Sequence, residues 1–216
     1  MCAVRKLAIP AGLAMLLGLS SASWAEKILD PRALVPITEE QIERLETLAA
    51  NVGWGLLFRT EQMAIADSAY GTGPVLSFSA TPYTPTLFFL ESRAWAVERF
   101  LDEAGADTRL DAFAIDPVDG LLFDILILSE TEEDIKSDGF SITYRDNTVS
   151  SIPVAVTQHE LSLEQAMGGD MYVARARGRV DLPPDHDWNR VSTMDLQFRA
   201  GAQAFDLTWA LVLPNP

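Results

Sequence analysis

Two histidines are the side chains in this 216-residue sequence whose surroundings best suit metal chemistry. His186 lies between two carboxylates in Asp185-His186-Asp187, and His159 precedes Glu160. Imidazole nitrogen and carboxylate oxygen together form a mixed ligand set for zinc, copper or another divalent ion. The spacing matches neither His-Glu-x-x-His nor His-x-His. The sequence therefore favours a solvated polar loop over a metal site built from His186, Asp185, Asp187 and His159.

Three arginines alternate along one predicted strand, at Arg175, Arg177 and Arg179. Because side chains two residues apart lie on the same face of a strand, the three guanidinium groups form a row. In an acidic protein this row either pairs with carboxylates on neighbouring strands, such as Asp195 or Asp206, or binds an anionic ligand or partner. Pairing requires no further assumption, so the sequence favours it.

Motifs for nucleophilic catalysis and phosphate binding are missing from the sequence, which contains no Gly-x-Ser-x-Gly and no glycine-rich loop that leads into a lysine. A glycosidase with two carboxylates remains open, since acidic residues are abundant. Asp124 interrupts an apolar run, and we expect it to reach solvent or an arginine. Trp188 lies beside a loop, where it could stack on a sugar ring or on a partner's side chain. The acidic loop 130–138 could hold calcium only in an irregular site, and a hydrated charge run is favoured.

The segment Leu121–Leu128 is the apolar run around which the fold is predicted to form. It is too apolar to alternate and too short for a good helix, as in a strand covered on both faces. Seven candidate strands follow from about residue 110. A single helical turn is also predicted between two of them, at Ser162–Gln165. This rhythm predicts an immunoglobulin-like antiparallel β-sandwich, although the Cys…Trp…Cys signature is missing.

The preceding residues predict a mixed α/β portion. Thr38 and Gln41 form a capping box for a helix over 39–51, and Gly53 ends it. We expect a short strand over 54–58, another over 75–80, and a second helix that begins at Ser92. The predicted fold class is therefore α+β, with an N-terminal α/β portion (26–108) packed against the sandwich (109–216).

Residues 1–25 have the three parts of a signal peptide. Arg5 and Lys6 are followed by an apolar stretch over 7–19 and by Ser23-Trp24-Ala25, a small-x-small cleavage site. The apolar stretch is shorter than the roughly 20 residues that span a bilayer, which favours cleavage over retention as an anchor. We therefore expect a periplasmic or secreted protein. The single cysteine, Cys2, lies in this segment, so the mature chain would have no disulfide.

The charge balance narrows the choice of partners. The full chain has 16 basic and 31 acidic residues, a net charge of −15, and loss of Arg5 and Lys6 leaves 14 against 31, or −17. Nucleic acids and anionic membrane surfaces are therefore not expected as partners, because both are negatively charged. Cationic partners and divalent metals are electrostatically easier to bind, but the favoured interpretation is that the charge only keeps an exported protein soluble.

These observations predict an exported, non-enzymatic protein that binds another envelope protein or a second copy of itself. The prediction rests on the sandwich pattern and on the lack of a catalytic motif. The alternatives are a periplasmic protein that binds a metal or small ligand, and a glycan or ester hydrolase. No cofactor is expected except a divalent metal, and no transmembrane segment is expected after the signal peptide is removed.

Overall fold

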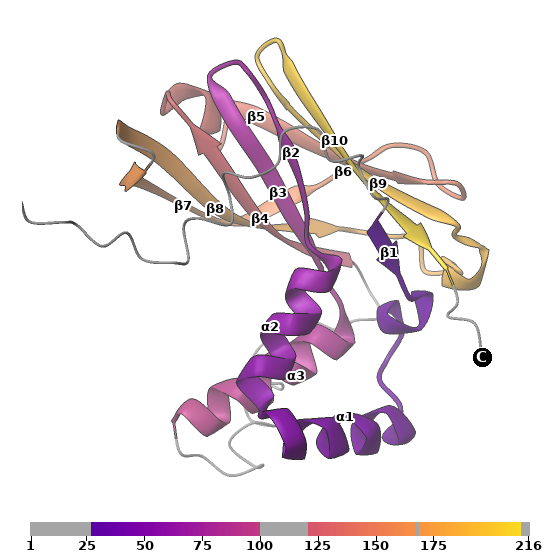
Figure 1. Cartoon of the computed structure of the whole chain (residues 1–216). Helices are drawn as coiled ribbons and strands as arrows, with labels where there is room; N and C mark the ends of the chain where they lie inside the picture. Colours follow the sequence, from indigo (N-terminus) through magenta and orange to yellow (C-terminus); the bar gives the residue numbers. More distant parts are fainter. Residues whose placement is uncertain (1–26, 100–120, 167–168, 213–216) are drawn as a thin grey trace, which may run out of the picture.

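The computed structural model of the chain describes residues 27–99, 121–166 and 169–212, which form two β-sheets and three α-helices (Figure 1). The protein is therefore α+β and largely β. The helices are α1 (Glu39–Val52), α2 (Trp54–Ile65) and α3 (Pro85–Glu98). Sheet A has the order β1 (Lys27–Leu29), β10 (Gln203–Leu211), β9 (Thr193–Ala200), β5 (Phe140–Asp146), β6 (Ile152–Pro153). Sheet B has the order β2 (Asp67–Tyr70), β3 (Val75–Tyr83), β4 (Leu121–Ser129), β8 (Gly169–Val180), β7 (Ala155–Ala166).

Strand β4 contains the apolar run and lies at the centre of sheet B. It pairs antiparallel with β3 on one side and with β8 on the other. The prediction of a central strand is therefore confirmed, but the prediction that both faces are covered is wrong, because Leu126 on the outer face is exposed. Pairing is antiparallel throughout both sheets except between β1 and β10, which are parallel.

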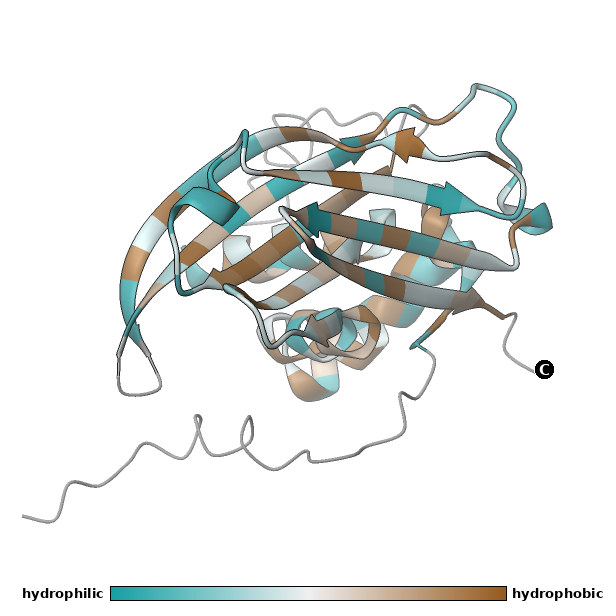
Figure 2. Cartoon of the chain, turned by 90° about the horizontal axis from the view of Figure 1, so that it is seen from above, coloured by the Kyte–Doolittle hydropathy of each residue, from teal (hydrophilic) through white to brown (hydrophobic). Residues whose placement is uncertain are grey.

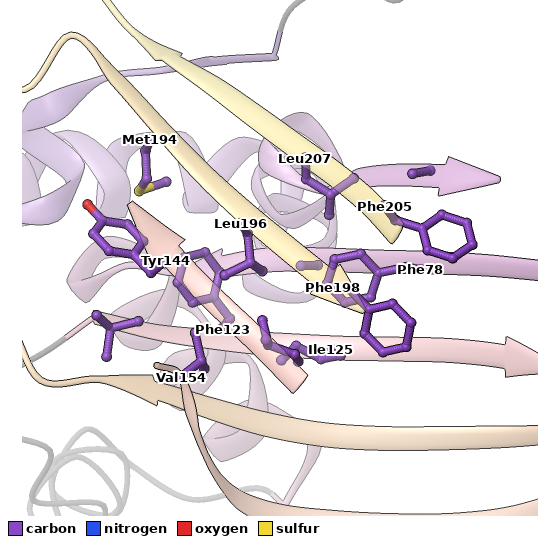
Figure 3. Packing of buried hydrophobic residues seen from close by; sticks show 14 of the residues in the cluster. Phe78, Phe123, Ile125, Tyr144, Val154, Met194, Leu196, Phe198, Phe205 and Leu207 are labelled. Carbon is purple, nitrogen blue, oxygen red and sulfur yellow. The ribbon is translucent and has the colours of Figure 1, made fainter. Parts of the chain in front are cut away.

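The two sheets pack face to face in a sandwich-like arrangement. Phe78 of β3 stacks on Phe198 of β9, with 4.8 Å between the ring centroids. The ring centroids of Phe123 of β4 and Trp209 of β10 are 5.9 Å apart. Figure 3 shows these inward-pointing side chains from β3 and β4 beside those of the opposite sheet. One continuous cluster of buried apolar residues fills the interior.

The exposed side of sheet A explains the period-2 pattern at the end of the sequence. In β9, Met194, Leu196 and Phe198 are fully buried, while the residues between them are at least partly exposed. Figure 2 shows the resulting alternation of hydrophobic and hydrophilic positions along these strands. The predicted hairpin of the last two strands is confirmed, because β9 and β10 pair antiparallel from Gln203↔Ala200 to Ala210↔Thr193.

The three helices gather below the sheets and build a small core of their own (Figure 1). Its buried residues are Leu45, Ala49, Leu57, Phe89 and Leu90. The end of α2 is tied to the main core, where the indole Nε1 of Trp209 donates a 2.7 Å hydrogen bond to the Ile65 carbonyl. The predicted capping box is confirmed: Thr38 Oγ1 accepts from the Gln41 amide, and Gln41 Oε1 accepts from the Thr38 amide.

The strand predicted over 54–58 is wrong, since these residues begin helix α2. Trp54, Leu57 and Phe58 all pack against the core of the helices. Their spacing of three and four residues is helical, but in so short a segment Trp54, Leu56 and Phe58 also alternate. Tertiary packing decides between the two periods.

The second helix begins seven residues before the predicted Ser92. Thr84 is its N-cap, with Oγ1 accepting from the Leu87 amide at 3.1 Å, and Pro85 occupies the first turn. Strand β3 also continues beyond the predicted end at Ala80 and includes Pro82. Proline is tolerated there because β2 pairs with β3 no further than Ala80, so that Pro82 has a strand neighbour, β4, on one side.

The helical turn predicted at Ser162–Gln165 is wrong, because β7 continues through it. Pairing to β8 along the whole segment satisfies the backbone better than an isolated turn would. The predicted boundary between residues 108 and 109 lies outside the described residues. Strands from both predicted portions share both sheets, since β1 pairs with β10 and β3 with β4.

The predicted signal peptide and Cys2 also lie outside the described residues. Over the residues that the structure does describe, none of the helices is both long and apolar enough to cross a membrane.

Strand β4 allows a matched test of the two-sheet core. Phe123→Ala removes a fully buried ring between the sheets and should lower the free energy of unfolding by about 3–5 kcal/mol. Leu126→Ala, on the opposite face of the same strand, should lower it by less than about 1 kcal/mol, because Leu126 is exposed. Urea denaturation of both variants measures the difference, and equal losses would contradict the assignment of the inner face.

Candidate functional site

The arginine row lies on the face of sheet B that points away from sheet A. On β8, Ala174 and Ala176 are buried in the core, whereas Arg175, Arg177 and Arg179 point the other way. Each arginine forms an ion pair with a different carboxylate. The pairs are Arg175–Glu164 (2.7 Å), Arg177–Asp124 (3.0 Å) and Arg179–Asp181 (2.7 Å).

Pairing with carboxylates on neighbouring strands, the interpretation favoured from sequence, is confirmed for Arg175 and Arg177, whereas Arg179 pairs with Asp181 two residues further along the chain. The partners suggested from sequence are wrong. Asp195 pairs with Arg145 of the neighbouring strand at 2.9 Å. Asp206 accepts a hydrogen bond from Gln197 at 2.8 Å. Both aspartates belong to sheet A, whereas the arginines belong to sheet B. The division of the strands between two sheets, which the sequence does not encode locally, selects the partners.

Arg177 has the most buried side chain of the three arginines. Its side chain is 19% exposed and that of Asp124 is 32% exposed, and the register places the two residues directly opposite each other on β8 and β4. The guanidinium also lies over the ring of Tyr83, 4.9 Å from its centroid. Asp124 therefore pairs with an arginine on the outer face, as expected. Arg175 and Arg179 are more exposed and remain accessible to a partner.

The difference in burial predicts unequal effects of substitution. Arg177→Ala should lower the free energy of unfolding by about 1–3 kcal/mol, because it leaves the half-buried Asp124 unpaired and uncovers Tyr83. Arg175→Ala should cost less than about 1 kcal/mol, since its ion pair is exposed and screened by solvent. Thermal and urea denaturation compare the two variants. A larger loss of unfolding free energy for Arg175→Ala than for Arg177→Ala would contradict this prediction.

His159 has a structural role in the described residues. Its Nε2 donates to the carbonyl oxygen of Ile135 at 2.9 Å, and its ring lies 5.9 Å from that of Phe140. Ile135 is fully buried, so this bond holds the loop after β4 against the β7 strand. His159 and His186 have different neighbours and do not share the predicted site.

The acidic loop pairs internally. Lys136 binds Glu133 at 2.8 Å and Glu132 at 3.6 Å, and the Thr131 hydroxyl donates to Asp134. The hydrogen bond that Lys136 donates to Glu133, with the charges of both glutamates, raises the pKa of Lys136. Among the described residues no group of three or more histidine, cysteine or acidic side chains is arranged to hold a metal ion. The four-residue metal site and the irregular calcium site therefore find no support in this part of the chain.

His186 instead lies beside Asp146, the last residue of β5, which in turn accepts a hydrogen bond from Tyr144. The imidazole Nε2 lies 3.6 Å from Asp146 Oδ2, and the two side chains are 4% and 0% exposed. The Tyr144 hydroxyl donates to the same Oδ2 at 2.6 Å. The loops that carry these groups are linked by Asn147, which donates to the Arg190 carbonyl and accepts from the Ser192 amide.

Both oxygens of the Asp146 carboxylate accept hydrogen bonds. Oδ1 accepts from the Thr148 amide and hydroxyl and from the Val149 amide at 2.6–2.9 Å. Burial acts to raise the pKa of Asp146, but the hydrogen bonds from Tyr144, Thr148 and Val149 outweigh it and hold this pKa below its ordinary value. Burial, reinforced by the bond to Asp146, raises the pKa of Tyr144 far above its ordinary range. At neutral pH the pair is a neutral phenol that donates to a carboxylate.

The residues beside His186 play different parts. Trp188 packs edge-on against the imidazole with a centroid distance of 4.5 Å, and it is half-buried against the main core. Asp187 caps a short 3-10 helix (Trp188–Arg190) by accepting from the Asn189 amide at 3.0 Å. Asp185 is exposed. Neither Tyr144 nor Asp146 belongs to a recognisable motif, so the sequence carries no local signal that brings them to His186, 40 or more positions away.

The Tyr144–Asp146 hydrogen bond can be tested with a single atom change. Tyr144→Phe removes one of the donors that hold the carboxylate and should lower the free energy of unfolding by about 1–3 kcal/mol, because the acceptor is buried. Tyr70→Phe is the control, since Tyr70 is exposed and should have little effect. Urea denaturation at neutral pH gives both values, and a neutral Tyr144→Phe would contradict a structural role for this bond.

Comparison with known proteins does not assign this chain to a family. The sequence matches no protein-family model, and the search of curated proteins finds no significant match. The functional argument therefore depends on the residues themselves.

Proposed function

We propose that this is an exported, non-enzymatic binding protein that recognises an extended segment of another envelope protein by adding it as a strand beside β7. The observation that supports the proposal is the outer position of β7 in sheet B. Among the described residues, β7 pairs with β8 on one side and has no strand on the other. The free N–H and C=O groups of such an edge form main-chain hydrogen bonds with an added strand.

Among the described strands, β7 is the longest one at an edge of either sheet. It has 12 residues, compared with 4 in β2, 3 in β1 and 2 in β6. Proteins usually protect an edge by keeping it short or by placing lysine or proline on it. The sequence of β7 contains neither residue, and the register shift between Val156 and Gln158 affects its first residues alone. From Gln158 onwards the edge offers about 30 Å of regular backbone.

The β7–β8 hairpin also extends past its neighbour. Pairing of β4 with β8 ends at Ser129↔Tyr172, while β7 and β8 remain paired as far as Ala166↔Gly169 (Figure 1). Leu163, on this extension, is 57% exposed. A strand added beside β7 would bring its own side chains next to Leu163.

Charge selects the kind of partner. Glu160 is exposed on the edge strand, Glu164 is partly neutralised by Arg175, and the full chain has a net charge of −15. Two copies of β7 would bring acidic strands together in acidic proteins, which disfavours self-association. The partner segment that fits best is extended, with lysine or arginine alternating with apolar residues.

For the fold class we propose a β-sandwich with its own strand order. The seven strands after residue 120 divide into four in sheet A and three in sheet B, the same numbers as in an immunoglobulin constant domain. In that domain the second strand shares a sheet with the first, whereas β5 pairs with β6 and β9 in the sheet opposite β4. The immunoglobulin-like assignment therefore stays a prediction.

Photo-crosslinking can locate the binding surface. A photoreactive amino acid at Leu163 should yield a covalent adduct with another envelope protein in cells that express the full chain. Matched controls are Ile28, on the β1 edge, and Leu56, on the exposed apolar side of α2, since both are also exposed. Adding Glu160→Lys to the Leu163 probe should reduce its yield several-fold, because the edge would then repel a basic segment.

Each other outcome of this experiment counts against the proposal. Adducts from Leu56 without adducts from Leu163 would move the binding surface to the helices. Adducts between two copies of the chain would contradict a foreign basic partner, and the absence of any adduct from Leu163 would contradict strand addition at β7.

A further inference from the structure

The buried imidazole of His186 lacks a hydrogen-bond partner. Its side chain is 4% exposed, and Nε2 is one of two buried side-chain atoms without a partner among the described residues, the other being the Tyr83 hydroxyl. Buried polar atoms in folded proteins are almost always paired, because burial removes them from water. An imidazole nitrogen left in this state points to a ligand.

The nearest polar group has the distance and the chemistry of a second ligand. Asp146 Oδ2 lies 3.6 Å from His186 Nε2, which is longer than a hydrogen bond. Ligand atoms that bind one zinc ion at about 2.0–2.2 Å lie about 3.3–3.7 Å from each other at tetrahedral to trigonal angles. The two atoms are therefore separated as a pair of ligands to one ion would be.

The surrounding residues hold both ligands as metal sites require. Three donors fix Oδ1 of Asp146, and the Tyr144 hydroxyl donates to Oδ2. Trp188 packs edge-on against the imidazole, 4.5 Å away. Such contacts around the ligands orient them and keep the carboxylate ionised for the metal.

We propose that His186 Nε2 and Asp146 Oδ2 bind one divalent transition-metal ion, copper or zinc, with water in its remaining coordination positions. Both metals accept a nitrogen and an oxygen ligand together. Asp185 and Asp187 are exposed on either side of His186, and the whole protein is acidic. Both the local carboxylates and the net negative charge attract a cation to this loop. The site differs from the one predicted from sequence, because Asp146 is the second ligand and His159, Asp185 and Asp187 are not ligands. It does not depend on the β7 edge.

The test uses the fluorescence of Trp188 and the two histidines of the chain. Titration of the full chain with Cu²⁺ should quench fluorescence, saturate at one equivalent and reverse with EDTA, since Trp188 lies next to the ligand imidazole. Trp188→Phe should lose most of the signal change. His186→Gln should weaken binding at least tenfold, while the matched control His159→Gln should bind as the unaltered protein does.

A second measurement on the unaltered protein keeps the proposal testable if His186→Gln does not fold. Addition of Zn²⁺ should shift the Nε2 resonance of His186 in a nitrogen-edited NMR spectrum and leave His159 unchanged. Equal quenching of folded His186→Gln, the absence of saturation with Cu²⁺, or a zinc-induced shift of His159 instead of His186 would each overturn the assignment.

Discussion

The packing of the two sheets against each other is the constraint on which the rest of the structure depends. Phe123 of β4 packs against Tyr144 and Trp209 of the opposite sheet, and Gly178 of β8 lies close to Val154, where the chain passes from sheet A to sheet B. A Cβ atom at Gly178 would lie 2.6 Å from Val154 and 3.0 Å from Ile125. The interior is therefore closely filled, and it fixes which face of every strand points outward.

Once the inner faces are set, the outer features follow from register. Arg177 meets Asp124 because β8 and β4 place these residues opposite each other, and Tyr144 reaches Asp146 at the end of β5. The histidines are separated by the same rule: His159 faces the Ile135 carbonyl, whereas His186 lies in a loop that packs against β5. Residues that are close in sequence or alike in type thus receive different roles.

Predictions from the sequence succeeded where a local signal was specific. The capping box at Thr38 and Gln41, the apolar run of β4 and the alternation in β9 and β10 each require a single conformation to satisfy hydrogen bonds or bury side chains. They failed where a short segment fitted two periods, as at Trp54–Phe58, or where a turn motif lay inside a long paired strand, as at Ser162.

The sequence by itself determined the α+β class, the acidic charge, the central position of β4 and the pairing of the arginine row with carboxylates. These follow from composition and from periods that extend over a few residues. The tertiary structure alone decided which carboxylates the arginines meet, that β7 lies at an edge, and that Asp146 lies beside His186. Arg177 and Asp124 are 53 positions apart along the chain, and Asp146 and His186 are 40 apart, so these contacts depend on how the strands are shared between the two sheets.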